Sequence, residues 1–190
     1  MKKQIIVYGT IAVACILIVF VLIFSNSKKT VSSIKDANDM KNMLKTIYKD
    51  VDLPSLITKK INVKNTNEVV SYTGLTDGDD IEVLVVSEPT MSSQAYLALV
   101  IKVKNNVDVE KLKEEIYENI DMSRWICVSA EQLYITNSGN LIFSVMADKD
   151  VAKAVYNDFK KYVNNNIGKE LEKSNDEENI ELPPEMPAAE

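Results

Sequence analysis

Residues 81–104 read IEVLVVSEPTMSSQAYLALVIKVK, and this stretch decides the fold class. The runs 81–87 and 95–104 are rich in the β-branched and other apolar residues that suit a pleated surface. Residues 88–94, which lie between them, form a polar connection with a proline near its start. The pattern predicts two antiparallel strands joined by a loop.

An amphipathic helix is predicted next, over about residues 108–122. Its apolar residues return at helical intervals among alternating charges, and they are Val109, Leu112, Ile116, Tyr117 and Ile120. Asp108 is placed to cap the first exposed N–H groups, and Lys111 and Glu115 are spaced to pair one turn apart.

Two further strands and a second helix follow. Residues 125–129, WICVS, predict a third strand that is interrupted before 133–136, LYIT. A turn at 137–140 and the apolar run 141–147 then predict a hairpin with a fourth strand. Asp148 is expected to cap the last helix. The apolar side of that helix contains Val151, Val155, Phe159, Tyr162 and Val163.

The segment before these strands predicts a helix over about 34–50, which ends at Asp52-Leu53-Pro54 because proline disfavours helix at the residue before it. Residues 55–75 are mixed: ITKKINVKN at 57–65 suggests short extended pieces, and Thr73-Gly74-Leu75 suggests a turn. The order of elements predicts an α+β fold: a two-layer sandwich with a mostly antiparallel four-stranded sheet and helices packed on one face.

A membrane anchor is predicted at the N-terminus, where residues 5–24 read IIVYGTIAVACILIVFVLIF without a charge. As a helix this run would reach about 30 Å, the hydrocarbon thickness of a bilayer. The basic stub at 1–4, MKKQ, favours an N-terminus inside and residues 28–190 outside the cell membrane. Two alternatives stay open, which are cleavage near 25–27 and lipidation of Cys15.

The predicted organisation has five parts: a cytoplasmic stub 1–4, a transmembrane signal-anchor helix 5–24, a juxtamembrane helix 25–52, an extracytoplasmic α+β domain 53–167 and an acidic, proline-containing disordered tail 168–190. The tail holds all of the net charge of −6, so the remainder is neutral. A neutral domain offers no positive field to nucleic acid, and nucleic-acid binding is therefore not expected.

The chain contains no histidine, which excludes Ser-His-Asp and Cys-His catalytic sites. Cys127 is the only cysteine outside the predicted anchor, so no internal disulfide is expected. Since Cys127 lies in an apolar run and has no histidine to activate it, it is predicted to be buried in a strand.

The densest group of oxygen ligands is Asp77, Asp79, Asp80 and Glu82. These are weak candidates for a Ca²⁺ site, because the twelve-residue spacing of an EF-hand is missing; the alternative is a turn that leads into a strand. No catalytic residue, cofactor-binding residue or cofactor is predicted. Glycines are few and dispersed, which argues against a phosphate-binding loop.

A second chemical candidate pairs a nucleophile from Ser92, Ser93 or Gln94 with Lys102 or Lys104 as a base. No recognised serine-lysine spacing supports it, and a polar hairpin loop explains these residues.

Several segments together resemble an uncharacterised bacterial domain-of-unknown-function family. They are Tyr72-Thr73-Gly74-Leu75, the strand IEVLVVS, the segment EPTMSSQAYLALVIKVKN and the later LYITNSGNLIFSVMAD. Members of that family are small envelope proteins of Gram-positive bacteria, many of them lipoproteins. The resemblance covers about residues 53–160 and implies a fold and a cellular location without implying an activity. This chain departs from the lipoprotein members by its predicted full membrane span.

The sequence thus favours a membrane-anchored, single-pass, non-enzymatic module that binds an envelope protein or a cell-wall component. The alternative is a carboxylate-dependent hydrolase or accessory factor acting at the cell wall, for which Asp79, Asp80 and Glu82 are the candidate residues.

Overall fold

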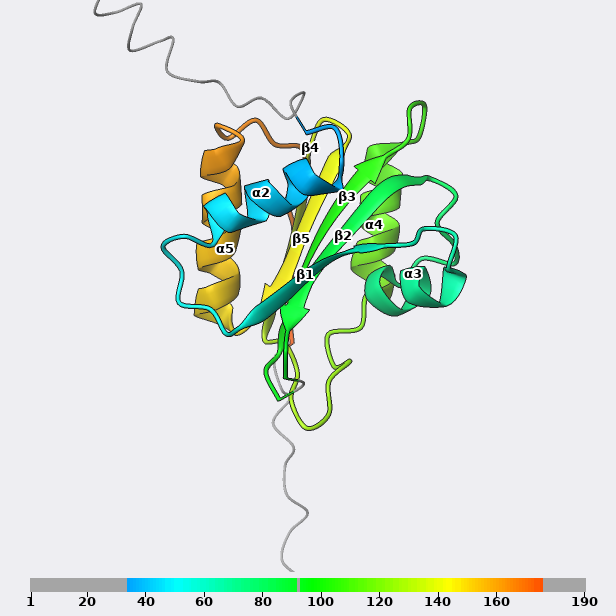
Figure 1. The fold of residues 1–190 in the computed structure, drawn as a ribbon. Helices are drawn as coiled ribbons and strands as arrows, with labels where there is room; N and C mark the ends of the chain where they lie inside the picture. Colours follow the sequence, from blue (N-terminus) through cyan, green and yellow to red (C-terminus); the bar gives the residue numbers. More distant parts are fainter. Residues whose placement is uncertain (1–33, 92, 176–190) are drawn as a thin grey trace, which may run out of the picture.

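The computed structural model describes residues 34–91 and 93–175 (Figure 1). In these residues a six-stranded antiparallel sheet has the order β1-β2-β3-β5-β4-β6. The strands are β1 (Leu56–Ile61), β2 (Ile81–Pro89), β3 (Tyr96–Val103), β4 (Gln132–Ser138), β5 (Leu141–Ala147) and β6 (Leu171–Ser174). The helices are α2 (Ala37–Ile47), α3 (Thr66–Thr73), α4 (Val109–Asn119) and α5 (Lys149–Tyr162). The predicted α+β class and antiparallel sheet are confirmed.

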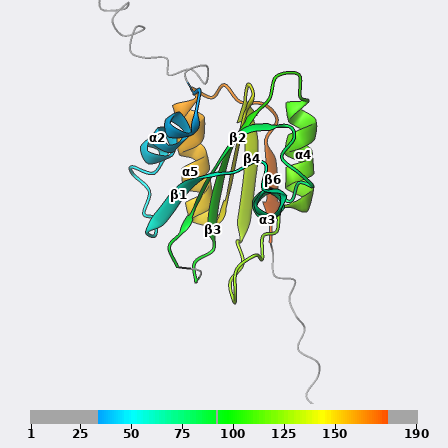
Figure 2. The same cartoon turned by 45° about the vertical axis from the view of Figure 1, so that its right-hand side comes forward.

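The prediction that the helices pack on one face was wrong, because helices cover both faces of the sheet (Figure 2). Helices α2 and α5 pack on one face, and α3 and α4 pack on the other. Successive side chains of a strand point to opposite faces, and in β3 both sets are apolar. Leu97, Leu99 and Ile101 join the core under α3 and α4, whereas Tyr96 and Val100 join the core under α2 and α5.

The prediction of four strands was also wrong, because β1 and β6 add an edge strand on each side. β6 lies inside the segment 168–190 that was predicted to be disordered. Its residues 171–174 pair with β4, and Leu133 lies opposite Lys173. The folded domain therefore extends beyond residue 167.

The predicted helix over 34–50 is confirmed as α2, although it is no separate juxtamembrane element. Asp36 caps it by accepting hydrogen bonds from the backbone N–H groups of Asn38 and Asp39. Its Met40, Met43 and Leu44 are fully buried against the sheet. The boundary predicted at residue 53 therefore does not separate two bodies.

Helix α3 was missed: extended pieces were predicted over 57–65 and a turn at 73–75, and no helix was predicted between them. Asn65 caps its N-terminus, and Gly74 ends it in the left-handed conformation with φ +73°. A Cβ at Gly74 would collide with the backbone carbonyl of Asn119 at the end of α4. Glycine is thus required both by the turn and by the close approach of α3 to α4.

Helices α4 and α5 and the β4–β5 hairpin are confirmed. The Asp108 carboxylate caps α4 by accepting from the N–H of Lys111 at 3.1 Å. The hairpin turns through Gly139, whose φ is +56°.

The strand predicted at 125–129 was wrong, because these residues belong to a loop between α4 and β4. The Ala130 N–H donates to the carbonyl of Met122 and closes this loop. Trp125 packs against the core under α3 and α4, whereas Ile126 is 76% exposed and Cys127 is exposed with φ +66°. The apolar run therefore contributes only part of its side chains to the core.

The chain enters and leaves the described domain at opposite ends of the sheet (Figure 1). The Lys35 carbonyl accepts from Lys102 Nζ near the end of β3, and we call this end proximal. The Asn175 N–H donates to the Glu131 carbonyl beside the start of β4, and we call that end distal. Between residues 34 and 175, none of the helices is both long enough and apolar enough for a membrane span. The predicted span at 5–24 lies outside the described residues.

Candidate binding pocket

The predicted acidic group is a packed turn at the proximal end of the sheet. Asp77 Oδ1 accepts from the N–H of Asp79 at 2.8 Å, and Glu82 Oε1 forms an ion pair with Lys102 Nζ at 2.9 Å. Lys104 Nζ donates to the carbonyl of Asp79. Gly78 lies against the carbonyl of Val63, where a Cβ would not fit.

These carboxylates do not converge on a metal position. Within the described residues there is no group of three or more Cys, Asp or Glu side chains that could hold a metal ion. Asp80 instead lines two adjoining hollows of about 270 and 110 Å³ together with Glu115 of α4. The turn interpretation accounts for the contacts of Asp77, Asp79 and Glu82.

The serine-lysine combination considered from the sequence is also separated by the fold. Ser93 lies before β3 at the distal end, whereas Lys102 lies near the other end of β3 and contacts Glu82 and Lys35. Ser92 lies outside the described residues. The structure does not bring Ser93 and Lys102 together.

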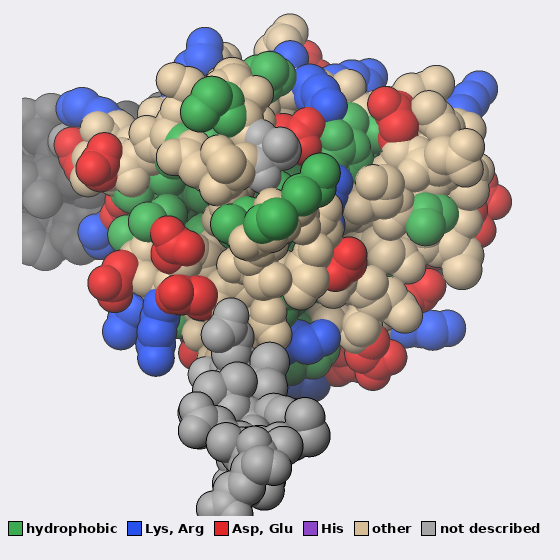
Figure 3. All heavy atoms as spheres, turned by 90° about the horizontal axis from the view of Figure 1, so that it is seen from below, with side chains coloured by type: hydrophobic (Ala, Val, Ile, Leu, Met, Phe, Trp, Pro, Cys, Tyr) green, Lys and Arg blue, Asp and Glu red, His purple; other side chains and the backbone are tan. Residues whose placement is uncertain are grey.

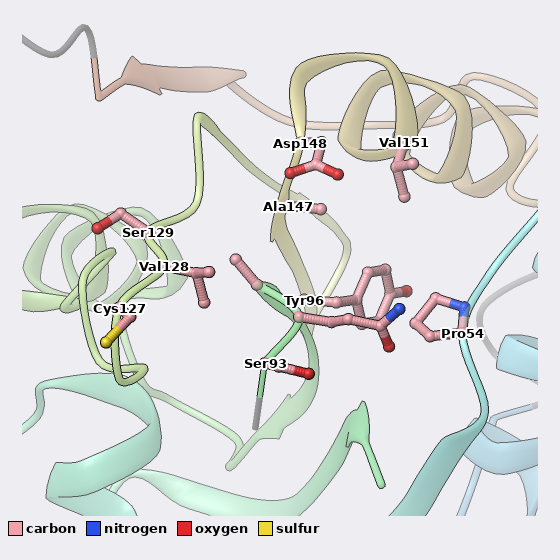
Figure 4. Close-up of a pocket in the computed structure, with 11 residues that line it drawn as sticks. Pro54, Ser93, Tyr96, Cys127, Val128, Ser129, Ala147, Asp148 and Val151 are labelled. Atoms are coloured by element: carbon pink, nitrogen blue, oxygen red, sulfur yellow. The ribbon is translucent and has the colours of Figure 1, made fainter. Parts of the chain in front are cut away.

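A larger pocket of about 390 Å³ opens at the distal end of the sheet (Figure 4). Four segments build it: the chain before β1, the loop entering β3, the loop 121–131, and the end of β5 with the start of α5. The lining residues are Pro54, Ser93, Gln94, Ala95, Tyr96, Cys127, Val128, Ser129, Ala147, Asp148 and Val151. In Figure 4 the loop with Cys127, Val128 and Ser129 lies on one side, across from Asp148 and Val151.

The loop that forms this side is held in place by polar contacts. Ser129 Oγ donates to Ser123 Oγ at 3.1 Å, and Arg124 Nη1 donates to the carbonyl of Ser71 in α3 at 2.9 Å. The Arg124 guanidinium also lies 4.6 Å from the centre of the Tyr72 ring. The cation–π contact and the hydrogen bond together attach the loop to α3. This side of the pocket is therefore held in a defined position.

Tyr96 forms the rigid base of the pocket. Only 2% of Tyr96 is exposed, and its ring meets that of Tyr48 edge to face at a centroid distance of 6.1 Å. Among the described residues neither hydroxyl has a hydrogen-bond partner within bonding geometry. Burial raises the pKa of Tyr48 to about 12, although the neighbouring Ser87 and Tyr96 hydroxyls act in the opposite direction. The same desolvation raises the pKa of Tyr96 well above its ordinary value.

Asp148 is the charged residue of the pocket lining. It occupies the N-cap position of α5, as predicted, but its carboxylate makes no capping hydrogen bond. The first N–H of the helix, that of Lys149, donates instead to Glu131 Oε2 at 3.0 Å. Asp148 is exposed, and no described residue forms a hydrogen bond or ion pair with its carboxylate. This carboxylate is therefore free for a ligand.

The distal end also exposes apolar side chains around the pocket. Met91 is 64% exposed and Ile126 is 76% exposed, and both lie on loops of this end. Figure 3 looks at this end, where hydrophobic side chains are spread over the middle with a few acidic ones among them, and many other charges lie toward the margin. Exposed apolar side chains that gather on one surface often mark a binding site.

The sequence pointed to one part of this site and missed the rest. Loop 88–94 was recognised as polar and exposed, and its end, with Ser93 and Gln94, lines the pocket. Cys127 was predicted to be buried and instead lies at the margin. Asp148 was predicted only as a helix cap. The sequence did carry a signal that it could belong to a site, because it directly follows the apolar strand LIFSVMA.

Comparison with known proteins adds no functional assignment. Searches with family models, curated proteins and solved structures found nothing that matches this chain.

Proposed function

We propose that this chain is a non-enzymatic binding module of the bacterial cell envelope, anchored by the span at 5–24 and facing outward. The observation that carries the proposal is the position of the pocket. It lies at the distal end, opposite the end at which the chain arrives from the proposed anchor. Tyr96 and Lys102 of β3 are six residues apart, which places about 20 Å of sheet between the two ends.

This arrangement suits a partner that is approached from outside the membrane. The N-terminus would lie in the cytoplasm, the proximal end would face the lipid and the distal loops would face the wall. An envelope protein or a wall component could then reach the pocket without meeting the bilayer. Both of these ligand classes agree with a site that combines polar groups with apolar side chains.

Cys127 offers a direct test, because it is exposed at the margin of the pocket. In a Cys15→Ala background it is the only cysteine of the chain. A maleimide that does not cross membranes should label it in intact cells as fully as in lysed cells. Labelling that requires lysis would show that the domain is not outside.

The partner is tested with a photoactivated crosslinker attached at the same position. The matched control carries Cys15→Ala, Cys127→Ser and Asn105→Cys, which moves the thiol to an exposed position at the proximal end. Adducts that form from Cys127 but not from position 105 support the proposal. No reproducible adduct, or the same adducts from both positions, would contradict it.

The alternative of a carboxylate-dependent hydrolase or accessory factor rests on Asp79, Asp80 and Glu82. The Glu82 carboxylate is engaged by Lys102, which gives this alternative no geometric advantage. Replacement of all three by alanine should leave the Cys127 adducts unchanged and should still support growth of a strain that needs the protein. Loss of growth with the adducts intact would favour the alternative.

A further inference from the structure

The distal pocket has the chemical character of a site for a cation carried on an aliphatic chain. Its lining combines one carboxylate, that of Asp148, with neutral polar groups from Ser93, Gln94 and Ser129. The rest of the wall is apolar, with Ala147, Val128, Val151 and Pro54. A volume of about 390 Å³ accommodates a small molecule or a single side chain with its backbone.

The state of the Asp148 carboxylate decides the sign of the ligand charge. In the described residues it lies beside the pocket with neither an ion pair nor a capping hydrogen bond. The helix N-terminus next to it would otherwise favour an anion. Here Glu131 already accepts from the N–H of Lys149, and two carboxylates therefore compensate the positive end of α5. Among the described residues that line the pocket there is no lysine or arginine, so an anionic ligand would meet this negative charge without a lining cation to balance it.

The chain that leaves the domain strengthens the same preference. The Glu131 N–H donates to the carbonyl of Ala147 in the pocket wall, and the Glu131 carbonyl accepts from the N–H of Asn175. The chain thus departs beside the pocket. Residues 176–190 contain six acidic residues and no lysine or arginine. This segment continues directly from Asn175, and its net charge of −6 favours cations over anions as ligands of the chain.

We infer that the distal pocket binds a ligand with a primary ammonium group on a short aliphatic chain, such as a lysine side chain of a peptide. Asp148 pairs with the ammonium group, and Val128, Val151 and Ala147 contact the aliphatic part. The amide group of Gln94 and the hydroxyl group of Ser93 bond the polar backbone of the ligand. This inference rests on the proposed function and names the ligand class of its site.

The test uses the full chain, labelled with ¹⁵N and held in detergent micelles. The probe is Nα-acetyl-lysine N-methylamide, and the matched neutral probe is the same compound with its Nε also acetylated. The lysine probe should shift backbone resonances of residues 93–96, 127–129 and 147–151. The neutral probe should bind at least about threefold more weakly, because it lacks the charge that pairs with Asp148.

Two variants complete the experiment. Asp148→Asn should weaken binding of the lysine probe about threefold or more and should remove the difference between the two probes. Asp150→Asn is the matched control, since Asp150 is exposed in the first turn of the same helix and does not line the pocket. It should bind the lysine probe as the unchanged protein does. The inference is overturned if no shifts occur at the pocket, if the two probes bind equally, or if Asp148→Asn binds as well as Asp150→Asn.

Failure of this inference can be told apart from failure of the proposed function. If the lysine probe does not bind but Cys127 still forms position-specific adducts in cells, only the ligand class is wrong. If Cys127 forms none, the binding module itself is contradicted, whatever the probe does.

Discussion

The two faces of the sheet bury polar groups in opposite ways. Under α4, the fully buried side chain of Lys113 uses all three of its N–H groups. Its Nζ donates to Asn137 Oδ1 at 2.7 Å and to the Lys169 carbonyl at 2.6 Å, and it pairs with Glu110 Oε2 at 2.8 Å. Under α2, the hydroxyls of Tyr48 and Tyr96 are buried and have no such partners among the described residues.

The difference indicates that the two buried groups have different structural roles. Lys113 links α4, the end of β4 and the chain before β6 through its three polar contacts, and we call this group of contacts the Lys113 junction. Gly168 belongs to that junction, because a Cβ there would meet the side chains of Asn137 and Glu110. A buried cation whose three N–H groups all have acceptors stabilises the packing of the segments that it joins. The two tyrosines instead supply ring area to the core, and Tyr96 also forms the base of the pocket. Their hydroxyls are buried without such acceptors among the described residues.

The largest effect is expected where the satisfied group is removed. Lys113→Met keeps the aliphatic stem but leaves Asn137 Oδ1 and the Lys169 carbonyl without their donor. We expect the free energy of unfolding to fall by about 2–3 kcal/mol, as measured by urea denaturation. Glu110 is half exposed and can be hydrated, which limits the loss. A change below about 0.5 kcal/mol would mean that the contacts of Lys113 do not stabilise the folded protein.

A backbone contact on the same face is expected to rank second. Gly74→Ala places a Cβ against the Asn119 carbonyl at a position with φ +73°. The combined collision and strain should lower the free energy of unfolding by about 2 kcal/mol. Thermal unfolding checks this, and Gly139→Ala is the control. It has a similar positive φ but an open surrounding, so its smaller loss isolates the cost of strain.

On the face covered by α2 and α5, removal of a buried polar group should raise the free energy of unfolding instead of lowering it. Tyr96→Phe removes a hydroxyl that has no partner, and the protein should gain up to about 1 kcal/mol at neutral pH. A loss of more than about 1 kcal/mol would mean that the hydroxyl has a partner in solution, and the contrast between the two faces would then be weaker.

The pH dependence of the same pair follows from the raised pKa values. The folded state holds the Tyr48 proton with a pKa of about 12, against 10.0 for an ordinary tyrosine. Stability from this group is complete below pH 10 and is lost as the pH rises toward 12. The urea midpoint should therefore fall over this range, and Tyr48→Phe should reduce the fall. An identical alkaline profile for both proteins would refute the buried position of this hydroxyl.

The smallest effect is expected for an exposed lysine two positions from Lys113. Lys111 and Glu115 were predicted to pair, but no ion pair between them occurs in the described structure. Lys111→Met should therefore change the free energy of unfolding by less than about 0.5 kcal/mol. It is also the matched control for Lys113→Met, since both changes remove a lysine from α4. Equal losses in the two variants would show that general charge, and not the buried junction, governs stability.

Several elements were readable from the sequence because local patterns specify them. The runs in β2, β3 and β5 predicted strands, and the period of apolar residues predicted α2, α4 and α5. Helix α3 was missed because its Val69, Val70 and Thr73 suit strands as well, although Asn65 and Gly74 carried capping signals. β6 has the polar sequence LEKS, and only its pairing with β4 makes it a strand.

The candidate site was less predictable than the fold. Loop 88–94 was recognised as exposed, but Asp148 and residues 127–129 reach it only because β3 and β5 are neighbours in the sheet. Cys127 was misplaced because an apolar run does not reveal which of its side chains a loop turns outward. The acidic residues Asp77, Asp79, Asp80 and Glu82 were conspicuous in the sequence. In the structure, however, the Asp77 carboxylate accepts a hydrogen bond within the turn and the Glu82 carboxylate pairs with Lys102.

The sequence alone determined the class of the fold, the antiparallel pairing of its hairpins and the absence of histidine chemistry. These follow from residue type and spacing, which act over a few residues. Only the tertiary structure decided that helices cover both faces, that Lys113 is buried with three acceptors, and that a pocket forms at the end of the sheet away from residue 34. Each of these depends on which distant segments become neighbours, because burial and partner choice are properties of the packed chain.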